Sequence, residues 1–93
     1  MPWPKATLRI TQGVWDIIYI LWNNGATLPG GRPASMFKQE PIEVMLDSAD
    51  ELVRDDTMWQ RLPTLIKAST KMGGDKDNQE LRQHLRELLE SCQ

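Results

Sequence analysis

The sequence predicts an all-α fold, a small single-domain bundle of about four helices with a proline- and glycine-rich loop after the first. The chain has 93 residues, the size of one small domain, so residues 1–93 are expected to share one core. Apolar residues recur every three or four positions in long segments, the spacing of one buried helix face. Residues that begin or stop helices stand at the ends of these segments, which supports the same fold class.

The N-terminal arm, residues 1–10, is expected to be extended. Prolines flank Trp3, and proline removes an amide donor and biases the preceding residue away from the helical conformation. Farther along, residues 25–33 hold three glycines and two prolines. Such a composition interrupts any regular element, so this segment is the predicted loop.

The segment between the arm and the loop is predicted to be the first helix. Thr11 is its candidate N-cap and Gly25 its candidate stop, and large apolar residues recur between them at helical spacing: Trp15, Ile18 and Trp22. Val, Trp, Ile and Tyr also favour strands, so the alternative is an α+β fold in which residues 14–22 form a strand.

Two further helices are predicted in the middle of the chain. The first spans residues 42–54, with Pro41 at its start and an apolar set at spacings of 3, 4, 7, 10 and 11: Ile42, Met45, Leu46, Ala49, Leu52 and Val53. The residues from Asp55 onward are expected to end this helix and to cap the next one, which is expected over residues 58–72. Pro63 falls inside that second segment, so the helix is expected to kink or to begin there.

The last predicted helix begins at Asp77, with Glu80 three residues later in an arrangement close to a capping box. Its apolar stripe follows in steps of three and four: Leu81, Leu85, Leu88, Leu89 and Cys92. A short chain with so marked a stripe is expected to have too little core to cover it, which predicts homodimerisation through this helix.

The composition argues against several functional classes. The one cysteine, Cys92, excludes an intrachain disulfide and favours a reducing, cytoplasmic location, and no signal peptide or membrane-length apolar stretch is present. The one histidine, His84, lies two helical turns from Cys92, about 12 Å away, so the two cannot form a catalytic pair. A single imidazole also makes a poor metal site. We therefore expect a protein that is not an enzyme and carries no cofactor or metal.

Charge is distributed unevenly along the chain. Residues 1–38 hold four basic and one acidic side chain, a net charge of +3, whereas residues 39–93 hold seven basic and twelve acidic, a net charge of −5. Within residues 39–56 seven acidic side chains stand against one basic. Four of them share the helix face opposite the apolar stripe: Glu43, Asp47, Asp50 and Glu51. This face is either simply solvated or a surface that engages a basic groove on a partner protein.

Four tryptophans offer large contact surfaces. Trp15, Trp22 and Trp59 lie on apolar helix faces and are expected in the core. Trp3 stands apart on the arm, where it either folds back onto the domain or anchors a partner. The sequence therefore predicts a protein-binding module, a small regulator or inhibitor, that acts through Trp3 and the acidic helix face.

One stretch of the chain resembles a known family. Residues 10–27, ITQGVWDIIYILWNNGAT, are similar to the first helix of winged-helix repressors of the penicillinase-repressor type. The resemblance implies an alternative function, DNA-bound transcriptional regulation, in which a recognition helix over residues 59–71 would use Arg61, Lys67 and Lys71. Pro63 interrupts that helix, and no wing pattern follows Gly74.

Overall fold

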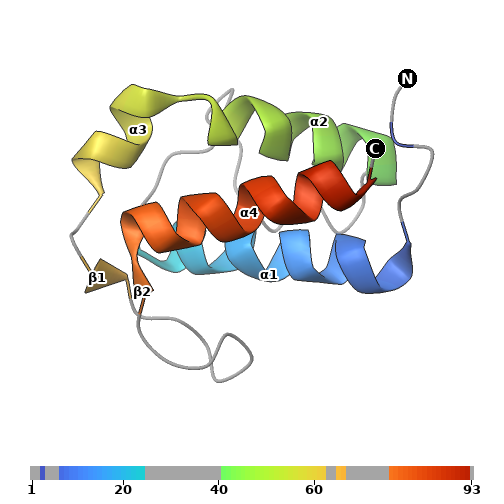
Figure 1. Cartoon of the computed structure of the whole chain (residues 1–93), viewed down its shortest axis with the longest axis horizontal. Helices are drawn as coiled ribbons and strands as arrows, with labels where there is room; N and C mark the ends of the chain where they lie inside the picture. Colours follow the sequence, from blue (N-terminus) through green and yellow to red (C-terminus); the bar gives the residue numbers. More distant parts are fainter. Residues whose placement is uncertain (1–2, 4–6, 25–40, 63–64, 67–75, 93) are drawn as a thin grey trace.

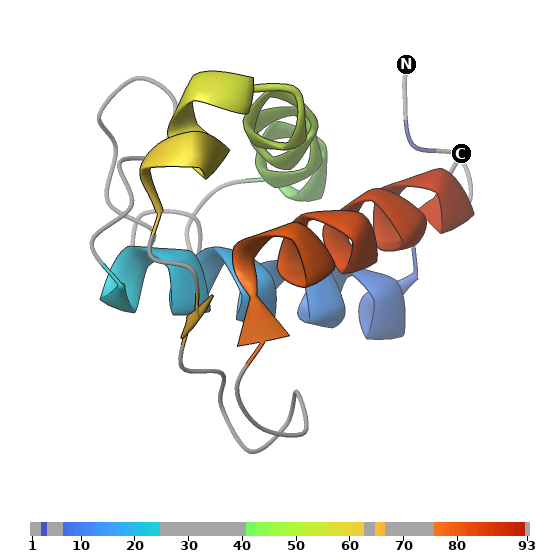
Figure 2. The ribbon, with the colours of Figure 1, turned by 60° about the vertical axis from the view of Figure 1, so that its left-hand side comes forward.

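The chain folds as an all-α bundle, as the sequence predicts. The computed structural model describes residues 3, 7–24, 41–62, 65–66 and 76–92. Its elements, in chain order, are α1 (Leu8–Asn23), α2 (Ile42–Val53), α3 (Asp56–Arg61), β1 (Leu65–Ile66), β2 (Lys76–Asp77) and α4 (Asn78–Cys92). Helices α1 and α4 lie side by side and run in opposite directions, and α2 packs on both (Figures 1 and 2). The predicted loop, residues 25–33, lies outside the described residues.

Helix α1 settles the choice between helix and strand for residues 14–22, because all of them lie within it, so the strand alternative is wrong. The helix begins at Leu8, earlier than predicted, which makes the last three residues of the expected extended arm helical. The hydroxyl of Thr7 accepts the amide of Ile10 at 3.3 Å and so supplies the cap expected from Thr11. The hydroxyl of Thr11 instead donates back to the carbonyl of Thr7 at 2.9 Å, inside the helix.

Helix α2 ends one residue before the predicted end. Of the helix expected over residues 58–72, residues 58–61 are helical, but Leu62 and the strand Leu65–Ile66 are extended, so one continuous helix over this span is wrong. The side chain of Asp55 accepts the amide of Met58 at 3.0 Å, which caps α3. Helix α3 then stops at Arg61, and Leu62 is extended with φ −73° and ψ 153°. Because Leu62 precedes Pro63, it is driven out of the helical region, so proline ends this helix rather than kinking or starting it.

The two short strands lie at the start of α4. They pair antiparallel, with Leu65 opposite Asp77 and Ile66 opposite Lys76. The carboxylate of Asp77 accepts the amide of Glu80 at 2.8 Å, so the predicted N-cap of the last helix is confirmed.

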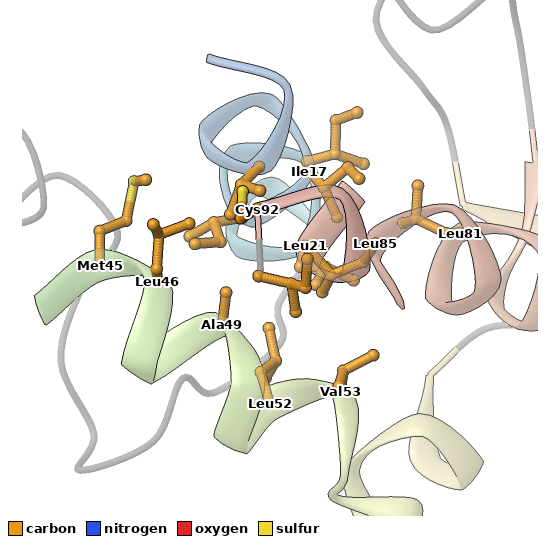
Figure 3. Close-up of a cluster of buried hydrophobic side chains, with 14 of the residues drawn as sticks. Ile17, Leu21, Met45, Leu46, Ala49, Leu52, Val53, Leu81, Leu85 and Cys92 are labelled. Atoms are coloured by element: carbon orange, nitrogen blue, oxygen red, sulfur yellow. The ribbon is translucent and has the colours of Figure 1, made fainter. Parts of the chain in front are cut away.

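The core lies where α1, α2 and α4 meet (Figure 3). Side chains of α2 point towards α1 and α4, whose own apolar side chains point back, and the labelled members are almost fully buried: Ile17, Leu21, Met45, Leu46, Ala49, Leu52, Val53, Leu81, Leu85 and Cys92. Four members of the α4 stripe are therefore buried within one chain, Leu81, Leu85, Leu89 and Cys92, and Leu88 is partly buried against the same core. Homodimerisation through this stripe stays a prediction.

Candidate functional site

The candidate site is the solvent side of α2. One side of this helix is buried in the core and includes Met45, Leu46 and Ala49. The helical repeat places Glu43, Asp47, Asp50 and Glu51 on the opposite side, and we call these four residues the acidic face. Glu43, Asp47 and Glu51 are exposed, one helical turn apart from each other, and Asp50 is half-buried. The predicted spacing thus produces a continuous strip of carboxylates along α2.

Trp3 and the acidic face, two separate candidates in the sequence, meet in the structure. The indole Nε1–H of Trp3 donates to Oδ1 of Asp47 at 2.9 Å, across 44 residues of sequence. The Trp3 side chain is partly buried and packs against the hydrophobic core. Trp3 therefore folds back onto the domain, and it does so at the middle of the acidic face.

The C-terminal end of the acidic face borders a shallow depression between α2 and α4. Asp50 pairs there with Arg54 at 3.1 Å, one turn later on the same helix. The depression holds about 270 Å³ and has a floor of buried apolar side chains and a rim of both charges: Asp50, Val53, Arg54, Arg86, Leu89 and Glu90. The rim carries two acidic and two basic side chains, so its charges balance.

The carboxylates of this strip differ in their partners. Asp47 accepts the Trp3 indole and Asp50 pairs with Arg54. Over the part of the chain that the structure describes, no hydrogen bond or ion pair engages the side-chain carboxylate of Glu43 or of Glu51. These two side chains are thus the least compensated charges of the acidic face.

The end of α2 is held by a cluster of polar contacts that no sequence pattern predicts. The indole Nε1–H of Trp59 donates to the Leu52 carbonyl at 2.8 Å, and Arg82 Nε donates to the Val53 carbonyl at 2.8 Å. Both carbonyls belong to the last turn of α2, where intrahelical donors run out. Side chains from α3 and α4 therefore cap α2, and a cation at a helix C-terminus also favours the helix dipole.

Arg82 is the centre of this cluster. Its Nη2 contacts Asp56 Oδ1, and its guanidinium lies 5.8 Å from the centre of the Trp59 ring. Asn78 Nδ2 completes the junction by donating to the Trp59 carbonyl at 2.7 Å. These contacts tie α2, α3 and α4 together, so the acidic face is carried by a helix that is fixed at its C-terminal end.

The three tryptophans predicted in the core differ in how deeply their side chains are buried. Trp59 is fully buried, which confirms its core role. Trp15 is only partly buried; it packs against the core and lies 5.9 Å from the Tyr19 ring at a tilt of 60°. The side chain of Trp22 lies outside the described part of the structure.

The cysteine and the histidine of the chain have different surroundings on α4. Cys92 is fully buried, and burial raises the pKa of its thiol, which keeps it in the unreactive protonated form. His84 is partly exposed on α4, beside Glu80 and Glu87 in an open depression. Across the described residues no group of three histidine, cysteine or acidic side chains is placed to hold a metal ion.

The basic residues of the DNA-binding alternative are not carried by one helix. Arg61 is the exposed last residue of α3, which is only six residues long. Lys67 and Lys71 lie outside the described residues, and the extended pair Leu65–Ile66 interrupts the helix predicted to carry all three. The recognition helix expected over residues 59–71 is therefore absent.

Comparison with known proteins adds no further functional information. No protein-family model matches this chain, and no curated protein and no solved structure matches it. None of the helices in the described ranges is long and apolar enough to cross a membrane.

Proposed function

We propose that this protein is a non-enzymatic protein-binding module, a small regulator or inhibitor, and that the acidic face of α2 engages its partner. The observation that carries the proposal is the strip of exposed carboxylates Glu43, Asp47 and Glu51, spaced one turn apart on a helix whose other side is buried. Negative side chains so arranged complement a basic groove on a partner.

Two physical features support this function. Like charges on one face produce a field that attracts a basic partner over several ångströms and raises the association rate at low salt. The face is also preorganised, because Arg82 and Trp59 cap the end of α2. A surface that is already ordered loses less conformational entropy on binding.

Capture of partners from extracts of cells that naturally produce the protein tests the proposal. The test variant is Glu43→Lys with Glu51→Lys, which reverses the two carboxylates that have no described partner. The matched control is Glu80→Lys with Glu87→Lys on α4. Each pair consists of two exposed residues on one helix, with one member in the first turn, and each changes the formal charge by the same amount. The two variants should therefore lose similar helix-dipole stabilisation, about 0.3–1 kcal/mol.

We expect one or more proteins to be retained by the wild type and by the α4 control and to be lost with the α2 variant. Circular dichroism of both variants should show the wild-type helix content. Equal retention by the α2 variant and the control would place the partner elsewhere on the molecule, and the acidic face would then have no role in binding.

A further inference from the structure

The contact between Trp3 and Asp47 places a large side chain of the protein's own N-terminal region on the acidic face. Asp47 lies between Glu43 and Glu51, one turn from each, and is therefore the centre of the strip. Its Oδ1 accepts the indole N–H at 2.9 Å.

The contact has a polar part and an apolar part. One side of it is a hydrogen bond to a charged acceptor at an exposed position, and the other is partial burial of the ring against the core. By comparison, Trp59 is completely buried and donates to a buried carbonyl. Loss of the Trp3 contact therefore requires no disruption of the core packing at Trp59.

We propose that the Trp3–Asp47 contact is autoinhibitory: the indole holds the central carboxylate in the free protein, and a cationic side chain of the partner must displace it. The proposal rests on the proposed function of the acidic face, and it adds that face's regulation. A partner element lying along Glu43, Asp47 and Glu51 meets the indole at the middle of its path. The apparent affinity is then reduced by the fraction of molecules in which Trp3 is released.

Hexalysine serves as the probe, at low ionic strength, with ¹⁵N-labelled full-length protein. Trp3→Phe keeps an aromatic ring but removes the N–H donor, and it identifies the Trp3 indole signal in the spectrum by its loss. Asp47→Ala removes the acceptor and gives the position of that signal in the released state. We expect Trp3→Phe to bind hexalysine about two- to tenfold more tightly than the wild type, the range expected for one hydrogen bond. In the wild type, the Trp3 indole signal should move towards its Asp47→Ala position as hexalysine is added.

Unchanged or weaker binding by Trp3→Phe would overturn the proposal, as would a Trp3 signal that stays in place while hexalysine saturates the protein. Failure of hexalysine to bind either form would also overturn the proposal that a cationic ligand competes with the indole for Asp47. The two proposals remain distinguishable. Loss of hexalysine binding in the variant with Glu43→Lys and Glu51→Lys, together with no effect of Trp3→Phe, would support the acidic face and reject its autoinhibition.

Discussion

Replacement of Arg82 by methionine tests how the end of α2 is held. Methionine keeps an unbranched apolar stem of similar length but removes the guanidinium. That group donates to the Val53 carbonyl, pairs with Asp56 and lies against the Trp59 ring, and its side chain is only 14% exposed. The variant therefore removes three interactions at once while leaving most of the packing in place.

The expected loss of unfolding free energy is the sum of what the three contacts contribute. A hydrogen bond from a charged donor contributes about 1.5–3 kcal/mol. The ion pair adds at most about 1 kcal/mol, because the Asp56 side chain is 74% exposed. The contact with Trp59 adds about 0.5–1 kcal/mol. Since water can reach part of the site in the variant, we expect a net loss of about 2–4 kcal/mol in the free energy of unfolding, which for a chain of this size lowers the melting temperature by roughly 8–32 °C.

Urea unfolding followed by far-ultraviolet circular dichroism measures this loss. Arg86→Met, one turn later on α4 and exposed, is the matched control and should change the unfolding free energy by less than about 0.5 kcal/mol. Asp56→Ala should cost less than about 1 kcal/mol. A cost below 1 kcal/mol for Arg82→Met, or an equal cost for Arg86→Met, would refute the assignment of Arg82 as the centre of the junction.

Three further predictions concern the core. Trp59→Phe should lower the unfolding free energy by about 1.5–3 kcal/mol in urea titrations, because it loses the hydrogen bond to the Leu52 carbonyl and leaves space in a fully buried position; a loss below 0.5 kcal/mol would contradict this. Gly13→Ala should raise the unfolding free energy by up to about 1 kcal/mol, because alanine has the higher helix propensity. The added Cβ would lie 3.2 Å from Cδ1 of Leu88, but that atom is the movable end of a side chain and can shift. A clear loss of unfolding free energy would show that this contact is rigid. Burial raises the pKa of the Cys92 thiol above its value in the unfolded chain, so the unfolded state ionises first as pH rises. The unfolding free energy should therefore be unaffected by this thiol below about pH 8 and fall above it. Urea titrations at pH 7 and pH 10 should show a larger fall in the wild type than in Cys92→Ala.

Features encoded by neighbouring residues could be predicted from the sequence. The apolar spacing that starts at Ile42 and the cap at Asp77 are local signals, and the structure has α2 and the start of α4 where these signals placed them. The exposure of Glu43, Asp47 and Glu51 follows from the same spacing, since residues opposite a buried face must point to solvent.

Signals that compete locally were harder to predict. Thr11 has a typical N-cap side chain, but a threonine hydroxyl can also donate back to a carbonyl of the preceding turn, and that is what it does inside α1. The apolar residues after Trp59 continued the helical spacing beyond Pro63. The effect of proline on Leu62 outweighed that spacing, and the helix ended.

Contacts between distant segments could not be predicted at all. Arg82 is one of several arginines on helix surfaces, and nothing near it in the sequence marks it as the donor to a carbonyl 29 residues earlier. The contact of Trp3 with Asp47 joins residues 44 positions apart, and no local pattern around either residue indicates it. These are also the contacts that the functional proposals use.

The most direct test of the acidic face is the association rate constant with a captured partner, measured for the wild type and the two paired charge reversals at low and high salt. We predict that Glu43→Lys with Glu51→Lys slows association at least tenfold at low salt and flattens its salt dependence, because steering by these carboxylates is lost. The pair on α4, Glu80→Lys with Glu87→Lys, should stay within about threefold of the wild type, since the same charge change lies outside the contact. Equal association rates for the wild type and the α2 variant at low salt would contradict the account.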